Sequence, residues 1–152
     1  MVPAGLARRQ ALSHVITDMW VPPGSVTGRL VPRLRNLYHP DLAGRVSAFN
    51  GPALMFEAGQ TLARANGWTR MVRRNEWFQS QALDVLKRRP LEATVLFSYS
   101  YTARRLFEYA KAAGLKTVMV QIDAGITEER LVAALQSRHP GLAPHWHPPP
   151  PE

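Results

Sequence analysis

Residues 93–134, ATVLFSYSYTARRLFEYAKAAGLKTVMVQIDAGITEERLVAA, decide the fold class of this chain. Two short runs of β-branched and aromatic residues, 94–97 and 116–122, flank an amphipathic segment at 103–113. Gly114 follows that segment, where a helix commonly ends. Two strands joined by a helix of this length predict a right-handed βαβ unit in a parallel sheet. Open parallel sheets bind ligands at the carboxyl ends of their strands, so the pattern also indicates where a site should lie.

The remaining sequence extends this pattern in both directions. We expect two further strands at 14–17 and 45–49, and helical segments at 7–12, 26–37, 52–65, 68–89 and after Gly125. A chain of 152 residues fits one domain, so residues 1–138 are predicted to form a Rossmann-like, three-layer α/β domain with about four mostly parallel strands. Six of the 13 prolines lie between Pro140 and Pro151, which predicts an extended tail or linker at 139–152.

Composition limits the chemistry that the chain can perform. It contains no cysteine, which excludes disulfides, thiolate metal sites and a cysteine nucleophile. No apolar run is long enough to cross a membrane and no signal peptide is evident, so we expect a cytoplasmic protein. The net charge of +8 comes almost wholly from arginine and suits anionic partners, although an arginine-rich composition without function would give the same charge.

Polar side chains follow each of the four expected strands. These candidates for an acceptor cleft are Asp18, Asn50, Ser98, Tyr99 and Asp123. If the strands are parallel, the side chains share one edge of the sheet, where carboxylates, an amide and hydroxyls could bind a ligand rich in hydroxyl groups. The alternative is that they cap the helices that follow and satisfy backbone N–H groups.

Two groups of arginines are candidates for contacts with anions. Arg104 and Arg105 fall in the first turn of the helix predicted at 103–113, where a bound phosphate would offset their unfavourable interaction with the helix dipole. The alternative is that both side chains are simply solvated.

The second group lies on one side of the helix predicted at 68–89. Arg70, Arg73, Arg74 and Trp77 combine cations with an aromatic ring, as helices on anionic membranes do. A solvated face with one aromatic ring packed on a neighbour would give the same pattern. The net charge alone would suit nucleic acid, which we do not expect as a partner.

Known catalytic and metal-binding motifs are missing from the sequence. There is no dinucleotide fingerprint, phosphate-binding loop, nucleophile elbow or zinc-protease motif. His139, His145 and His147 lie close together, but they belong to the proline-rich tail, so no metal site is expected. The catalytic residues stay unknown at this stage.

Several stretches together resemble the N-terminal domain of GT-B glycosyltransferases, closest to a bacterial group with a family-four-like domain. The similar residues are 97–118 (FSYSYTARRLFEYAKAAGLKTV), 121–123 (QID) and 128–132 (EERLV), with 15–18, 38–42, 46–50 and 74–78 earlier in the chain. The resemblance implies a hexosyltransferase-type enzyme that moves a sugar from a nucleotide-sugar to a hydroxyl acceptor, which is a sugar or a lipid-linked molecule. The N-terminal domain of that family binds the acceptor, whereas a second domain binds the donor.

The chain departs from this family pattern at both ends. The donor domain is absent from it, and the usual opening strand also looks absent, so we expect a truncated domain that is inactive alone. No cofactor is expected in this chain, because the nucleotide-sugar belongs to a second domain or a separate chain. The expected location is cytoplasmic, with peripheral attachment to the inner membrane face. The alternatives are a stand-alone basic module that docks on an anionic membrane, and a gene relic.

Overall fold

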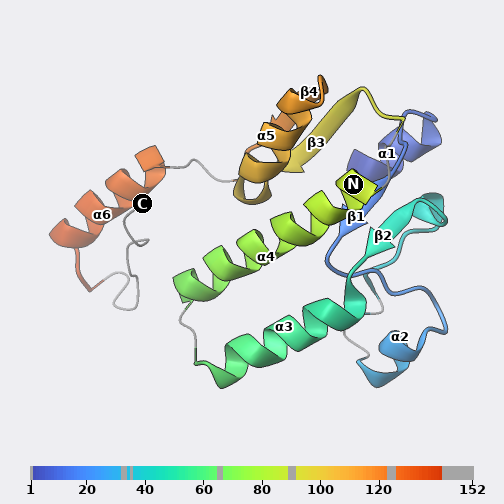
Figure 1. Ribbon diagram of the computed structural model, residues 1–152. Helices are drawn as coiled ribbons and strands as arrows, with labels where there is room; N and C mark the ends of the chain where they lie inside the picture. Colours follow the sequence, from blue (N-terminus) through green and yellow to red (C-terminus); the bar gives the residue numbers. More distant parts are fainter. Residues whose placement is uncertain are drawn as a thin grey trace.

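The computed structural model describes residues 2–31, 34, 36–64, 67–88, 92–122 and 126–141, with the side chains of Leu30 and Ile126 not included. These residues form a mixed α/β fold (Figure 1). In chain order its elements are α1 (Val2–Arg8), β1 (Val15–Thr17), α2 (Val26–Leu30), η2 (Pro40–Leu42), β2 (Val46–Ala48), α3 (Asn50–Leu62), α4 (Gly67–Arg88), β3 (Val95–Tyr99), η3 (Ser100–Thr102), α5 (Arg104–Ala112), β4 (Lys116–Val120) and α6 (Ile126–Arg138).

All four predicted strands are present, and each pairs in parallel. β1 pairs with β2 from Val15 opposite Val46, and β3 pairs with β4 from Val95 opposite Lys116. Both pairs run from upper right to lower left in Figure 1, so their carboxyl ends lie on the same side. The β3–α5–β4 unit therefore has the parallel arrangement that residues 93–122 predict.

The prediction of one four-stranded sheet needs correction. The described strands form two separate two-stranded sheets, and no backbone hydrogen bond joins β1 to β3 within the described residues. Ile16 of β1 and Leu96 of β3 instead pack against the same cluster of helical side chains. Packing on shared helices, not a continuous ladder, thus holds the two pairs in one domain.

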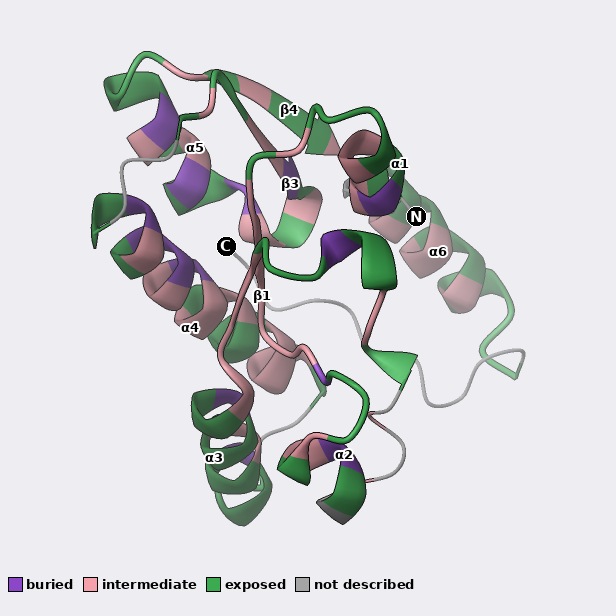
Figure 2. Ribbon diagram, turned by 90° about the vertical axis from the view of Figure 1, so that its right-hand side faces the viewer, coloured by how far each residue is buried: buried purple, intermediate pink, exposed green. Residues whose placement is uncertain are grey.

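The core lies where α4 and α5 cover the strands. Its buried cluster consists of Ala82, Leu83 and Leu86 from α4 with Leu106 from α5. Figure 2 shows α4 and α5 together on one side of the strands. The apolar spacing predicted for 68–89 is what places this α4 face on the core.

Helix ends mostly follow their local sequence signals. α5 is followed by Gly114, whose φ of +72° is the left-handed conformation that glycine adopts at little cost. α1 ends at Arg8, so it includes only the first two residues of the helical segment predicted at 7–12. α2 covers only the beginning of the helical segment predicted at 26–37. The predicted tail lies outside the described residues beyond Gly141.

α6 differs from the other long helices in how little it packs. None of its described side chains is buried, and Leu131 and Leu135 are 60% and 48% exposed. In Figure 1 it lies apart from the sheets. Within the described part of the chain, no helix has the length and hydropathy that a membrane span requires.

Candidate functional site

The best-defined candidate site lies at the carboxyl end of the β1–β2 pair. The chain leaves β1 at Thr17, passes through residues 18–25 and enters α2. Asn50, the first residue of α3, holds this loop through both of its amide atoms. Its Oδ1 accepts from Trp20 N–H at 2.7 Å, and its Nδ2 donates to the Trp20 carbonyl at 2.6 Å.

Further contacts fix the loop beyond Trp20. The Trp20 ring lies 5.0 Å from the ring of Tyr38, centroid to centroid. The Val21 N–H donates to the Leu37 carbonyl at 2.9 Å, and the Val21 side chain is only 1% exposed. The loop is therefore anchored through its backbone, an aromatic pair and a buried side chain.

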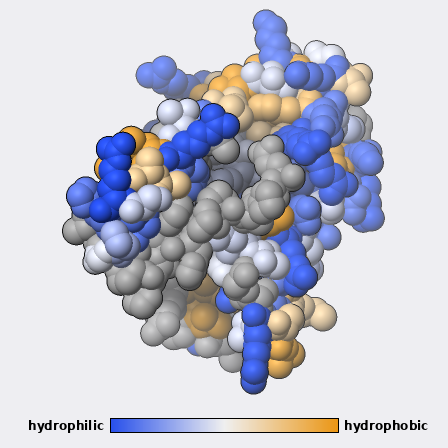
Figure 3. Space-filling view, turned by 90° about the vertical axis from the view of Figure 1, so that its left-hand side faces the viewer, coloured by the Kyte–Doolittle hydropathy of each residue, from blue (hydrophilic) through white to orange (hydrophobic). Residues whose placement is uncertain are grey.

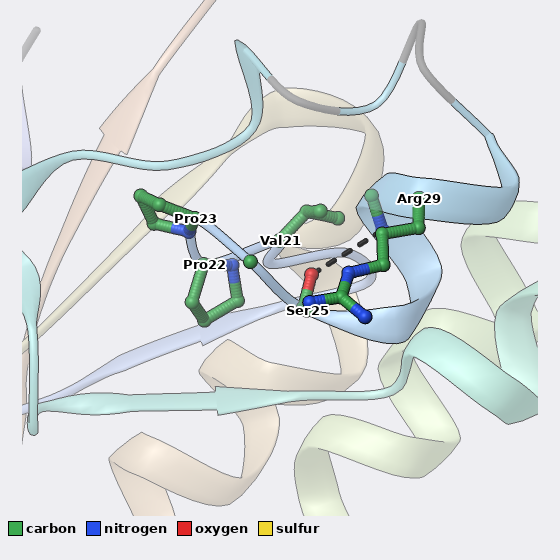
Figure 4. A pocket seen from close by; sticks show the side chains of 7 residues that line it. Val21, Pro22, Pro23, Ser25 and Arg29 are labelled. Atoms are coloured by element: carbon green, nitrogen blue, oxygen red, sulfur yellow. Dashed lines mark hydrogen bonds between the residues drawn. The ribbon is translucent and has the colours of Figure 1, made fainter.

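A pocket of about 320 Å³ opens on this anchored loop (Figure 4). Its lining residues are Val21, Pro22, Pro23, Gly24, Ser25, Gly28 and Arg29. The volume is at the lower end of the range for ligand pockets and suits a group about the size of one sugar ring. The wall combines the apolar faces of Pro22 and Pro23 with the polar side chains of Ser25 and Arg29 (Figure 4).

The local sequence explains how the pocket wall forms. Gly24 has a φ of +79°, which lets the chain turn sharply before α2. Ser25 then caps α2, because its Oγ accepts from the Gly28 N–H at 3.3 Å. The Ser25 hydroxyl hydrogen stays available to donate to a ligand, and Arg29 is exposed one turn later.

Asp18, the first of the predicted cleft residues, forms contacts inside the molecule. Its carboxylate pairs with the Arg74 guanidinium and accepts from Thr17 Oγ1 at 3.3 Å. Arg74 also lies 3.5 Å from Glu57 on α3. Asp18 therefore ties the start of the pocket loop to the α3–α4 hairpin, and it does not line the pocket.

The cleft candidates on the second strand pair are placed differently. Ser98 is buried, and its Oγ lies 3.1 Å from Thr102 Oγ1 within the turn that follows β3. Tyr99 is 42% exposed, with its ring packed edge-on against Phe97 at 5.7 Å. Asp123 lies outside the described residues. Of the predicted cleft residues described here, only Tyr99 is exposed at the end of its strand.

At the N-terminus of α5, where the sequence predicts an anion site, a backbone N–H group is hydrogen-bonded to a side chain of the protein itself. The Arg105 N–H donates to Oε1 of the buried Gln79 at 2.9 Å, and the Arg105 guanidinium donates to Ser80 Oγ at 2.7 Å. Arg104 is almost fully exposed and lies 3.6 Å from Glu108 along the same helix. Gln79 thus occupies one N–H group that a bound phosphate would need.

The predicted membrane face on α4 is largely engaged with α3. Trp77 stacks on Phe56 with ring centroids 5.1 Å apart, and Arg70 Nε donates to Glu57 at 3.0 Å. Arg74 pairs with Asp18, as described above. Arg73 is exposed and forms no hydrogen bond or ion pair with the other described residues.

The pocket-lining residues were not among the candidates predicted from the sequence. The signal that could have found them is Pro22-Pro23-Gly24, separated by four residues from the end of the first strand, because a turn in the loop that follows a strand's carboxyl end shapes a ligand-binding loop. Its anchors could not be found in the same way, since Asn50 and Trp20 are 30 residues apart.

The described residues contain no group of three or more His, Asp or Glu side chains that could hold a metal ion. No protein family, curated protein or solved structure matches the chain. The function must therefore be argued from the geometry of the site and from the sequence resemblance.

Proposed function

We propose that this chain is the acceptor-side domain of a glycosyltransferase, and that a sugar ring of the hydroxyl acceptor binds in the β1–α2 pocket. The observation that carries the proposal is the position of the pocket, at the carboxyl end of a parallel strand pair on a loop fixed by Asn50. Parallel sheets bind ligands on that side. The resemblance to GT-B N-terminal domains points to the same half of the fold.

The chemistry of the wall suits a carbohydrate. Sugar rings present C–H faces that pack on apolar surfaces, and the rings of Pro22 and Pro23 offer such a surface. The Ser25 hydroxyl and the Arg29 guanidinium can hydrogen-bond sugar hydroxyls at the edge of the ring. Arg29 would also bind the phosphate of a lipid-linked acceptor.

The proposal changes the role of the polar residues at the strand ends. Asp18 and Asn50 hold the loop that carries the pocket, whereas Ser25 and Arg29 contact the acceptor. A nucleotide-sugar donor would be bound by a second domain or chain, and transfer would occur between the two. The setting we propose is the cytoplasmic face of a membrane that holds the acceptor.

Titration of the isotope-labelled chain, followed by NMR, tests this proposal. The probes are glucose, galactose, mannose and N-acetylglucosamine, with uridine diphosphate as a donor fragment. We expect at least one sugar to shift the amide signals throughout residues 21–29. Uridine diphosphate should shift Arg29 alone, through its phosphates, and leave residues 21–25 unchanged. Absence of any sugar-dependent shift in this loop would overturn the proposal. Sugar transfer catalysed by this chain alone would contradict its acceptor-only role.

A further inference from the structure

The outward face of α3 is apolar along its whole length. Gly51, Met55, Ala58 and Leu62 follow one another at intervals of four, three and four residues, which aligns them on one side of a helix. All four are exposed, with Met55 at 78% and Leu62 at 85%. We call these four residues the α3 stripe.

The inward face of the same helix combines apolar Ala53 and Phe56 with the polar side chains of α3. Asn50 holds Trp20, Glu57 pairs with Arg70, and Gln60 is buried with its Oε1 unpartnered among the described residues. Glu57 is the only charged residue of α3. α3 therefore places its one charged residue on the inward side, beside the buried Ala53, and leaves an uncharged, apolar side exposed.

No polar group on the outward side offsets the exposed apolar area. Thr61 is near the stripe, but its hydroxyl already donates to the Glu57 carbonyl at 2.9 Å. Leu54, on the other flank, is 40% exposed. Figure 3 shows hydrophobic surface at the lower end of the molecule, where α3 lies. An uncharged face of this kind is characteristic of a contact with an apolar partner.

The net charge of the α3–α4 segment indicates the kind of partner. Between Asn50 and Asn75 the sequence has four arginines and one glutamate, a net charge of +3 from four minus one. Arg64 and Arg73 are exposed, and the side chain of Arg70 is 44% exposed although it pairs with Glu57. Arg64 is exposed two residues after Leu62, and an apolar helix face with exposed arginines on the same segment suits the surface of an anionic membrane.

We propose that the α3 stripe docks on an anionic lipid surface. Met55 and Leu62 enter the boundary between headgroups and acyl chains, while Arg64 and Arg73 contact lipid phosphates. The proposal does not depend on the acceptor pocket, because the stripe and the pocket share no residue. It also moves the membrane contact from Trp77, which stacks on Phe56, to the opposite side of α3.

Co-sedimentation of the whole chain with vesicles tests the proposal. The vesicles consist of phosphatidylcholine alone or of phosphatidylcholine with phosphatidylglycerol. We expect binding to the anionic vesicles that weakens with salt, and much weaker binding to the neutral ones. Replacing both Met55→Gln and Leu62→Gln should reduce binding about tenfold or more, because each change removes an apolar side chain from the lipid.

α6 supplies the matched control. Leu131 and Leu135 are also exposed leucines, so Leu131→Gln with Leu135→Gln removes similar apolar area elsewhere and should leave binding unchanged. Circular dichroism melting checks that each variant folds, and Leu62→Gln alone serves if the double variant does not. Equal loss in both double variants, or no loss in either, would overturn the proposal. A dimer that the Met55/Leu62 changes dissociate, without vesicle binding, would assign the stripe to a second copy instead.

Discussion

Asn50 binds both main-chain groups of Trp20, with its Oδ1 accepting at 2.7 Å and its Nδ2 donating at 2.6 Å. The side-chain amide of Asn50 thus makes the two hydrogen bonds that a neighbouring strand would otherwise make to a residue just beyond the end of the β1–β2 ladder. Asn50 also begins α3, so a single residue links the pocket loop to the helix that carries the apolar stripe.

Replacing Asn50 should therefore destabilise the fold. Asn50→Ala leaves two partly buried backbone groups of Trp20 without their partner, which costs roughly 1–3 kcal/mol of unfolding free energy. Urea unfolding measures this cost. Asn36→Ala, at an exposed position, is the control and should change stability by less than about 0.5 kcal/mol. Similar values for the two variants would show that the clamp on Trp20 contributes nothing.

Gln79 should hold the start of α5 against α4. Its buried amide accepts from the Arg105 N–H at 2.9 Å and donates to the Asn75 carbonyl at 3.2 Å. Gln79→Ala should cost roughly 1–3 kcal/mol and should speed hydrogen exchange of the Arg105 amide. Gln81→Ala, on the same helix but away from the fully buried face, is the matched control. Unchanged exchange at Arg105 in Gln79→Ala would contradict the contact.

The two strand pairs predict an alternating pattern of amide exchange along β3. The Lys116 N–H donates to the Thr94 carbonyl, so Leu96 and Ser98 also direct their backbone groups toward β4. The backbone N–H and C=O groups of Val95, Phe97 and Tyr99 point to the opposite edge of β3. No described strand is hydrogen-bonded to that edge. NMR exchange rates should be slow at Leu96 and Ser98 and faster at Phe97. Equal protection at all three positions would indicate a continuous sheet.

Trp77 and the α3 stripe should affect different properties. Trp77 stacks on Phe56 between α3 and α4, so Trp77→Leu should lower stability by roughly 1–3 kcal/mol. Vesicle binding by the folded Trp77→Leu protein should equal that of the parent chain. The paired changes Met55→Gln and Leu62→Gln should instead reduce vesicle binding and leave stability nearly unchanged. If Trp77→Leu abolished vesicle binding while its fold persisted, the membrane contact would belong to α4.

Local sequence patterns were sufficient to predict most helices and strands, but not how the strands pair and pack together. The four strands and α3 to α6 could be predicted because hydrophobic periodicity, Gly114 and the proline in the first turn of α3 are local signals. Whether β1 and β3 share hydrogen bonds depends on contacts between residues about 80 positions apart, such as the packing of Ile16 and Leu96 on one cluster. No local pattern contains that information.

The candidate residues show the same limit. Helical spacing correctly places Arg70, Arg74 and Trp77 away from the buried leucines of α4, yet it cannot reveal that Glu57 and Phe56 of α3 cover them. The polar residues predicted at the strand ends include Asp18 and Asn50, which follow β1 and β2 but bind partners inside the molecule. The stripe could have been found by placing residues 50–62 on a helical wheel, because its intervals are regular.

The measurement that tests the central claim most directly is the affinity of the pocket for a neutral sugar, in the parent chain and in two arginine variants. The sugar is the one that shifts residues 21–29 most strongly. Arg29→Ala should weaken its binding about tenfold, because a charged hydrogen bond to the ligand is lost. Arg138→Ala, at an exposed position on α6, should bind like the parent. Equal affinity of all three proteins, or sugar-dependent shifts confined to residues outside 21–29, would contradict an acceptor site in this pocket.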